Sequence, residues 1–138
     1  MKIAVFTDTY PPFINGVSTS CYNLVQTLKS HGHDVVVVCP RTTNGPLEFK
    51  DGIIYIPGIE IKRIYGYRIT NIYYRKVVNM LRDFGVELIH NQTDVGIGQF
   101  ARIAARQLNV PQVYTYHTAY EDYTYYVVHG LMDRVGKK

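Results

Sequence analysis

The stretch Gly32-His33-Asp34-Val35-Val36-Val37-Val38-Cys39-Pro40 decides the class of fold, because it places four consecutive valines between a glycine and a proline. A strand with one face in water alternates apolar and polar residues, whereas a strand covered on both faces is apolar throughout. The run of valines therefore predicts a strand inside a sheet that has helices on both sides. Gly32 is expected to end the preceding helix, and Pro40 is expected to stop the strand.

Strands and helices alternate outward from this stretch in both directions. Short apolar strands are expected at residues 2–6, 86–90 and 113–116. Amphipathic helices are expected from a cap at Ser18 or Thr19 up to Gly32, and again at residues 71–84 and 95–108, where apolar residues recur at helical spacing. Buried strands that alternate with helices form right-handed parallel βαβ units. The sequence thus predicts an α/β protein with a Rossmann-like, doubly wound, mainly parallel sheet.

Three segments depart from this pattern. Residues 48–56 contain Asp51-Gly52 between β-prone stretches, which predicts a hairpin. Residues 57–70 are basic and aromatic and are expected to be irregular, and residues 118–138 are expected to form helix and loop. Open α/β sheets bind ligands beyond the carboxyl ends of their strands, so functional residues are expected mainly in the segments that follow the strands.

The composition of the chain excludes several classes of protein. With 46% hydrophobic and 19% charged residues in a length of 138, it is not a disordered tail. No stretch approaches the roughly 20 apolar residues of a membrane-spanning helix. The apolar run at residues 3–6 is shorter than that of a signal peptide, so a cytoplasmic protein is expected. Cys21 and Cys39 have no metal-binding or redox spacing, and they are interpreted as reduced core thiols.

The positive charge is concentrated in one segment. The net charge is +4, and residues 61–82 hold six basic residues and no acid, against nine basic and 11 acidic residues elsewhere. This excess indicates an anionic partner, which could be a lipid surface, a nucleic acid or a phosphate, although a solvated flap would carry the same charges. No nucleic-acid-binding motif accompanies the segment. Its isoleucines and tyrosines favour a membrane surface, where cations meet lipid phosphates.

The loop at residues 7–17 leads into the first helix. It has neither the Gly-x-Gly-x-x-Gly spacing of dinucleotide-binding folds nor the lysine and hydroxyl of a P-loop, which argues against a dehydrogenase and a phosphate-cleaving ATPase. Asn15-Gly16-Val17 nevertheless runs directly into a helix N-terminus, whose amide groups and dipole can hold a phosphate. A capped turn without a ligand is the alternative interpretation.

His117 follows an apolar strand, and a neutral imidazole can both donate and accept a hydrogen bond. A histidine in such a loop is either functional or structural. Glu121 and Asp122 favour a functional role because carboxylates can orient an imidazole or bind hydroxyl groups, although both also suit a solvated turn or a helix start. His90 also ends a predicted strand, but it has no acidic companions and no role is predicted for it.

Four stretches of the sequence carry a family resemblance. They are residues 2–12 with 15–17, Gly32-His33-Asp34-Val35, residues 88–93, and Tyr116-His117-Thr118-Ala119-Tyr120-Glu121-Asp122-Tyr123. Together they resemble retaining glycosyltransferases of family four, which have the GT-B fold. The last stretch is the most specific, and it resembles the diacylglycerol glucosyltransferase branch of Gram-positive bacteria and mycoplasmas.

The resemblance implies roles for particular residues. Residues 1–138 would be the N-terminal, acceptor-side half of a GT-B fold, truncated before its last strands and without the C-terminal domain that binds the nucleotide sugar. Asn15, Gly16 and Val17 would form the donor-phosphate loop, with Asn15 in place of a family glycine and able to adopt a positive φ. His117 would be the catalytic residue beside the transferred sugar. The acceptor-side candidates are Asp8, Tyr10, Glu121 and Asp122, and the membrane-contact candidates are Lys62, Arg63, Tyr65, Tyr67 and Arg68.

By the same resemblance, the full-length parent is expected to transfer a hexose, with glucose preferred, from a UDP-sugar to a membrane lipid such as 1,2-diacylglycerol with retention. No cofactor beyond the donor substrate, no metal and no nucleic acid is expected. The parent should bind peripherally at the inner face of the cell membrane, and the isolated chain should be inactive. Two alternatives remain open, namely a transferase with a soluble sugar or metabolite acceptor, and a non-catalytic module that binds a membrane surface or nucleic acid.

Overall fold

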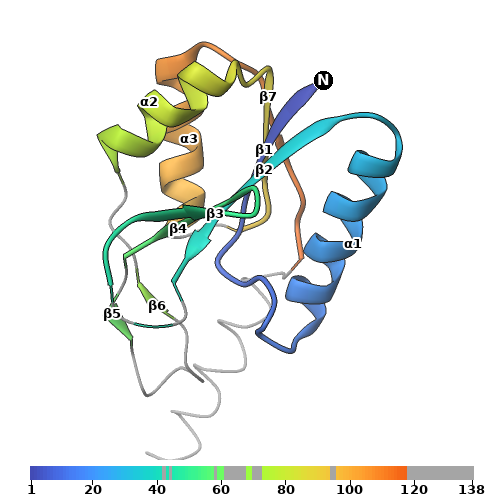
Figure 1. The fold of residues 1–138 in the computed structure, drawn as a ribbon, viewed down its shortest axis with the longest axis vertical. Coiled ribbons are helices and arrows are strands. Elements are labelled where there is room, and N and C mark those ends of the chain that lie inside the picture. Colours follow the sequence, from blue (N-terminus) through green and yellow to red (C-terminus); the bar gives the residue numbers. More distant parts are fainter. Residues whose placement is uncertain are drawn as a thin grey trace, which may run out of the picture.

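The computed structural model describes residues 1–41, 43, 45–57, 73–93 and 96–117, together with the backbone of residues 59–60 and 68–69. Its main feature is a six-stranded sheet in the order β3-β4-β2-β1-β7-β8. Figure 1 shows helices on both sides of this sheet. The strands are β1 (Lys2–Phe6), β2 (Asp34–Pro40), β3 (Glu48–Lys50), β4 (Ile53–Ile56), β7 (Leu88–Asn91) and β8 (Gln112–Tyr114). The helices are α1 (Gly16–Ser30), α2 (Arg75–Phe84) and α3 (Ile97–Leu108).

Parallel pairing brings the carboxyl ends of the central strands to one edge. Phe6, the last residue of β1, lies beside Val38 of β2 and beside Asn91 of β7, and Asn91 lies beside Tyr114 of β8. β4 pairs parallel with β2, whereas β3 pairs antiparallel with β4. The structure therefore confirms the predicted α/β fold with a mainly parallel, doubly wound sheet.

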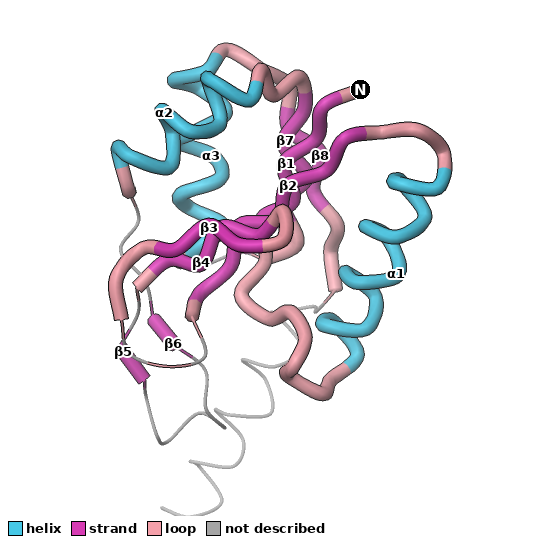
Figure 2. Tube along the Cα trace, in the orientation of Figure 1, coloured by secondary structure: helices cyan, strands magenta, loops and turns pink. Residues whose placement is uncertain are grey.

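The valines of β2 are buried on both faces of the sheet, as their sequence predicted. Each of the residues 35–38 is at most 8% exposed. Val36 and Val38 pack in the cluster beneath α2 and α3, whereas Val35 and Val37 pack in the cluster beneath α1. Successive side chains of a strand point to opposite faces, so a continuous apolar run fits a sheet with helices on both sides. Figure 2 shows this three-layer arrangement.

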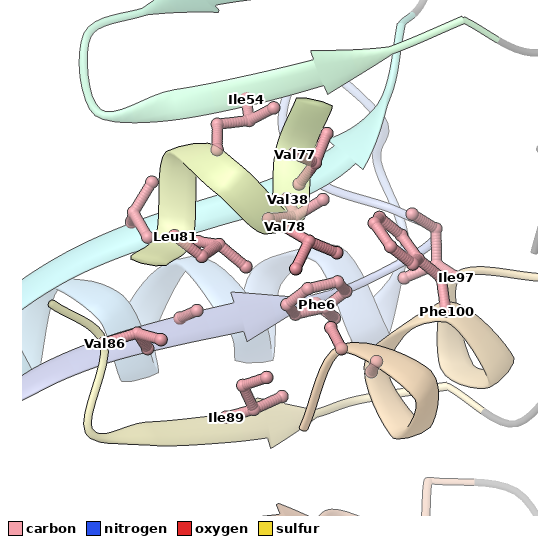
Figure 3. Packing of buried hydrophobic residues seen from close by; sticks show 14 of the residues in the cluster. Phe6, Val38, Ile54, Val77, Val78, Leu81, Val86, Ile89, Ile97 and Phe100 are labelled. Atoms are coloured by element: carbon pink, nitrogen blue, oxygen red, sulfur yellow. The ribbon is translucent and has the colours of Figure 1, made fainter. Parts of the chain in front are cut away.

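The larger core lies between the sheet and helices α2 and α3 (Figure 3). Phe6 of β1 and Phe100 of α3 meet edge to face, with ring centroids 5.4 Å apart and ring planes at 76°. Val77 and Leu81 of α2 lie one turn apart on the same helix face, and both are fully buried in this cluster. The helical spacing read from the sequence thus identified the faces that pack on the sheet.

The smaller core lies between the sheet and α1 and contains both cysteines. Cys21 and Val25 of α1 pack in one cluster with Val37 and Cys39 of β2. Both cysteines are free and buried. Burial raises the pKa of Cys21 to about 11 and that of Cys39 to about 12, so both thiols are protonated at neutral pH. The interpretation of the cysteines as reduced core thiols is confirmed.

The start of α1 differs from the prediction. The helix begins at Gly16, and Asn15 is its N-cap, with Oδ1 accepting a hydrogen bond from the amide of Ser18 at 2.8 Å. The predicted cap at Ser18 or Thr19 is therefore wrong. Asparagine caps helices at least as well as serine, and Asn15 reaches the amide of the third helical residue before the hydroxyl residues are needed.

The helix ends follow the predicted signals more closely. Gly32 has a φ of +86° just beyond α1, and Gly85 and Asn109 cap α2 and α3 in the left-handed conformation. Glycine and asparagine adopt this conformation at low cost, so they stop helices efficiently. The start of α2 is later than predicted, because Tyr74 has an extended backbone and serves as the N-cap.

The segment between β2 and α2 agrees with the prediction in one part and differs in another. Asp51 and Gly52, with φ of +54° and +77°, form the predicted two-residue turn between β3 and β4. The expectation of an irregular segment is wrong at β5 (Ile59–Glu60) and β6 (Arg68–Ile69), which pair antiparallel. The predicted helix and loop at residues 118–138 lie outside the described residues. None of the described helices has the length and apolar character needed to cross a bilayer.

Candidate functional site at the carboxyl edge of the sheet

The candidate site lies where β1, β7 and β8 end. From β1 the chain passes through α1 to β2, which is one neighbour of β1 in the sheet. It later returns through α2 to β7, which is the neighbour on the opposite side of β1. The loops after β1 and β7 therefore diverge, which is the topological switch point where open α/β sheets bind ligands. The amide of Gln92 donates to the carbonyl of Phe6 at 2.9 Å, and that of Thr115 donates to the carbonyl of Asn91 at 3.0 Å. These bonds continue the strand pairing and hold the loop residues in place.

Hydroxyl groups order the loop between β1 and α1. The Thr7 hydroxyl donates to the carbonyl of Thr9 at 2.8 Å, and the Thr9 hydroxyl lies 3.5 Å from Oδ1 of Asn15. Asn15 has an extended backbone with a φ of −158°, so it does not adopt the positive φ considered from the sequence. The reason is its capping role, because an N-cap residue needs an extended backbone to bring its side chain onto the helix end.

Gly16 and Val17 form the first turn of α1. Their amides precede the first hydrogen bonds within the helix, so they belong to the polar end at which anions bind. Gly16 is exposed, and a Cβ atom built on it would meet no atom within 4 Å. Packing therefore does not require glycine at this position. The missing side chain leaves the backbone of the first turn open to close approach.

Asp8 lies between the end of β1 and the start of α3. Burial raises the pKa of Asp8 to about 7, and the side chain of Thr93 and the backbone amide of Ile97 partly oppose that rise. Ile97 is the first residue of α3, which has no acidic residue in its own first turn. The Asp8 carboxyl group is therefore placed to interact with a helix N-terminus, and it titrates in the range where a carboxyl group can exchange a proton at neutral pH.

His117 belongs to a chain of four polar side chains at the ends of β7 and β8. His117 Nε2 lies 2.5 Å from Oε1 of Gln92, and Nε2 of Gln92 donates to Oγ1 of Thr115 at 3.5 Å. Thr115 Oγ1 lies 2.6 Å from Nε2 of His90. Gln92 is only 3% exposed. Burial, and then the nearby His117, lower the pKa of His90, so this imidazole is neutral at neutral pH.

Other residues predicted from the sequence lie apart from these four polar side chains or outside the described residues. Tyr10 is 7% exposed and packs in the core beneath α1, where burial raises its pKa to about 12. Its acceptor-side role stays a prediction. Of Arg68 only the backbone is described, in β6. The remaining acceptor-side and membrane-contact candidates lie outside the described residues, and they are Glu121, Asp122, Lys62, Arg63, Tyr65 and Tyr67.

Sequence reasoning gave no role to three members of the polar chain, namely His90, Gln92 and Thr115. A usable signal existed, because His90 and Gln92 are two residues apart, as are Thr115 and His117, and this spacing puts each pair on one face of an extended chain. The buried hydroxyl of Ser18 had no comparable signal, and it has no hydrogen-bond partner among the described residues. The buried hydroxyl of Thr93 had no such signal either, and it interacts with the Asp8 carboxyl group.

Gly98 joins α3 tightly to the loop after β7. A Cβ atom built on Gly98 would lie 2.0 Å from the carbonyl oxygen of Thr93 and 2.7 Å from its carbonyl carbon. The side chain of Asn91 bridges the same elements, donating to the carbonyl of Gly98 at 3.3 Å and accepting from the amide of Thr93 at 3.1 Å. The loop that carries Gln92 is thus supported by direct backbone packing. Within the described ranges, no three His, Cys, Asp or Glu side chains gather closely enough to hold a metal.

Comparison with known proteins identifies relatives over most of the chain. The chain is 35% identical to the alpha-monoglucosyldiacylglycerol synthase of Acholeplasma laidlawii over 129 residues, which are 92% of this chain and 32% of that protein. It is 33% identical to the alpha-monoglucosyldiacylglycerol synthase of Streptococcus pneumoniae, across 97% of this chain and 30% of that protein. A third relative is the GDP-mannose-dependent alpha-mannosyltransferase of Corynebacterium glutamicum, 30% identical across 86% of this chain and 29% of that protein.

The chain thus spans about a third of the length of the curated relatives it matches. A family model described as Glycosyltransferase Family 4 matches residues 14–138. The matched region contains the start of α1 and the polar chain around His117. The chain therefore belongs to glycosyltransferase family 4.

Proposed function

We propose that the full-length protein containing this chain transfers glucose from UDP-glucose to 1,2-diacylglycerol with retention of the anomeric configuration. Residues 1–138 would form the acceptor-side domain, and a further C-terminal domain would bind the nucleotide sugar. The relatives' names support this substrate class, because two proteins at 33% and 35% identity are alpha-monoglucosyldiacylglycerol synthases. The chain's coverage of about a third of these proteins supports the existence of a second domain.

The observation that carries the proposal is the position of His117. Its ring is held at the end of β8, beside the loop after β7 and at the switch point of the sheet. A neutral imidazole at this place can hydrogen-bond a hydroxyl group of a sugar or an acceptor. His117 would therefore contact the transferred glucose and orient it for attack by the acceptor hydroxyl. Interactions that strengthen as charge develops on the sugar would lower the barrier to transfer.

The start of α1 would contact the donor diphosphate. The amides of Gly16 and Val17 lie at a helix N-terminus whose first residue bears no side chain, and the polar end of a helix attracts phosphate. Asn15 would hold this turn in shape through its bond to Ser18. In a two-domain enzyme, the donor held by the other domain would complete the site between these amides and His117.

The acceptor would reach the site from a membrane. Asp8 and Tyr10 would lie on the acceptor side together with Glu121 and Asp122. Between residues 61 and 82 the chain has six basic residues and no acid, interspersed with isoleucine and tyrosine. Such a segment binds anionic headgroups through its cations and the bilayer interface through its apolar side chains. We therefore place the protein at the inner face of the cell membrane as a peripheral protein, where diacylglycerol is available.

The proposal is tested by giving the full-length protein either labelled UDP-glucose or labelled GDP-mannose with diacylglycerol in mixed micelles. The GDP-mannose arm is needed because a related mannosyltransferase is 30% identical to this chain. Glucosylated diacylglycerol in the α configuration is expected, as judged by chromatography and by the anomeric proton coupling. Transfer of mannose alone would refute UDP-glucose as the donor. Glucose transfer only to soluble sugars, supplied in a parallel reaction, would refute the lipid acceptor.

A further inference from the structure

The hydrogen bonds that link His117 to His90 have a fixed order of donors and acceptors, and the side-chain amide of Gln92 sets that order. An amide oxygen can only accept a hydrogen bond, and an amide nitrogen can only donate one. Oε1 of Gln92 faces His117, so Nε2 of His117 must carry the proton in that contact. Nε2 of Gln92 donates to Thr115 Oγ1, which leaves the single hydroxyl proton of Thr115 for Nε2 of His90.

The opposite direction would require different protons on both imidazoles. If the amide of Gln92 were reversed, Nε2 of His117 would accept instead of donate, and Nε2 of His90 would have to carry a proton. The two directions exclude each other because the Thr115 hydroxyl has one proton to donate. The observed direction requires a neutral His90, because an imidazolium would donate from Nε2 to Thr115. Burial, and then the nearby His117, lower the pKa of His90 and so favour a neutral ring.

We infer that Gln92 is a positioning residue for His117, holding its imidazole in the Nε2–H tautomer so that the unprotonated Nδ1 accepts a hydrogen bond from a hydroxyl group of the bound sugar or acceptor. The nature of that ligand rests on the function proposed above. The tautomer itself rests on the hydrogen-bond chain alone. His117 and Gln92 would thus act as one unit, in which only the histidine touches the substrate.

The surroundings of Gln92 suit such a role. The side chain is buried, its own amide bonds the carbonyl of Phe6, and its loop is supported from behind by Gly98. A buried hydrogen-bonding group held at both ends has little freedom to reorient. A carboxylate at this position would also accept from His117, but its charge would favour the imidazolium form. An amide accepts the same hydrogen bond without adding a charge.

The tautomers of His117 and His90 can be read directly from long-range ¹H–¹⁵N correlation spectra of the 138-residue chain above the imidazole pKa range. In the wild type, His117 should show a protonated Nε2 and an unprotonated Nδ1. Gln92→Met removes both hydrogen bonds at nearly constant length, so His117 should lose its single tautomer and show averaged nitrogen shifts. His31, whose Nδ1 lies 2.8 Å from the carbonyl oxygen of Thr27, should keep its pattern in every spectrum and is the internal control.

A second variant separates hydrogen bonding from folding. The Gln92→Glu carboxylate accepts from both neighbours, so His117 should return to the Nε2–H tautomer while His90 changes to Nε2–H. Restoration at His117 with reversal at His90 cannot result from a general loss of structure. A wild-type His117 with its proton on Nδ1, or an unchanged tautomer in Gln92→Met, would overturn the inference.

Activity of the full-length protein provides a readout of the consequence. Gln92→Met should lower kcat by about tenfold or more with little change in the KM for UDP-glucose, on the scale of one misplaced polar group. Gln92→Glu should recover part of kcat. Unchanged kcat in a variant whose tautomer had changed would overturn the link to the ligand. Absence of glucose transfer by the wild type would refute the proposed function instead, and the spectra would still decide the role of Gln92.

Discussion

Replacing Asp8 with asparagine should change how the stability of the chain depends on pH. The pKa of Asp8 is raised from 3.8 to about 7 by burial. Between these two values the folded state keeps the proton of Asp8 while the unfolded state releases it, so the folded state binds more protons. The free energy of unfolding therefore falls as pH rises from about 4 to about 7, and it levels off above that range. Asp8→Asn removes the titrating group and should remove this fall.

The size of the effect follows from the shift. A displacement of about three pKa units corresponds to roughly 4 kcal/mol, since each unit is worth about 1.4 kcal/mol. Part of it develops below pH 5, so about 3 kcal/mol is expected between roughly pH 5 and pH 8. That amount is a large fraction of the total stability of a domain of this size. Relative to the wild type, Asp8→Asn should therefore gain stability as pH increases.

Urea denaturation followed by circular dichroism at several pH values measures this difference directly. Asp83→Asn, at an exposed position near the end of α2, is the matched control, because it also removes one carboxylate. The difference between Asp8→Asn and the wild type should grow with pH, whereas that between Asp83→Asn and the wild type should stay nearly constant. Using differences cancels the opposite contribution of His90, whose lowered pKa reduces stability as pH falls below about 6.5. Parallel curves for Asp8→Asn and the wild type would refute the buried titration of Asp8.

Further predictions concern packing, transfer and membrane binding. In urea denaturation, Gly98→Ala should lower the free energy of unfolding by about 2–3 kcal/mol, because its methyl group meets the backbone of Thr93. Gly16→Ala has open space around the new methyl group, so it should change the free energy of unfolding by less than about 1 kcal/mol. Equal effects of the two alanines would contradict the close packing of α3. In the full-length protein, His117→Ala should lower kcat by about a hundredfold with little change in melting temperature, and the exposed His31→Ala serves as control. Preserved activity with a collapse in stability would instead make His117 a structural residue. A triple variant should replace three cations of the basic segment with alanine, namely Lys62, Arg63 and Arg68. Its partitioning onto anionic vesicles in co-sedimentation should be roughly a hundredfold weaker, since each cation contributes about 1 kcal/mol. Equal sedimentation of the triple variant and the wild type would argue against the membrane role.

The sequence predicted those parts of the fold that depend on local patterns. The valine run of β2, the Asp51-Gly52 turn and the stops at Gly85 and Asn109 each combine one residue type with one backbone requirement. Such rules act over a few residues, so they can be read without knowing the rest of the chain. The cap of α1 was missed because Asn15, Ser18 and Thr19 all suit an N-cap, and only the path of the loop selects among them.

The site could be predicted only in part, since its contacts depend on the alignment of strands that are distant in sequence. His117 was identified from its place after a strand and from the family resemblance. Its link to Gln92 requires that β7 and β8 pair with Asn91 beside Tyr114, and no local pattern specifies that register. The raised pKa of Asp8 likewise has no local signal, because it results from burial of the carboxyl group, which is set by tertiary packing.

The uniform valine run of β2 also affects how this strand is aligned with its neighbours. Sliding the strand by one residue would replace valine with valine on both faces, so apolar burial alone hardly distinguishes one alignment from the next. The contacts that distinguish the alignments lie at the two ends of the strand. The amide of Asp34 donates to the carbonyl of Met1, and the amide of Arg41 donates to the carbonyl of Ile56, both at 2.9 Å. A substitution in the middle of β2 should therefore alter how strongly the sheet holds together, whereas an insertion or deletion at either end should alter which residues face each other.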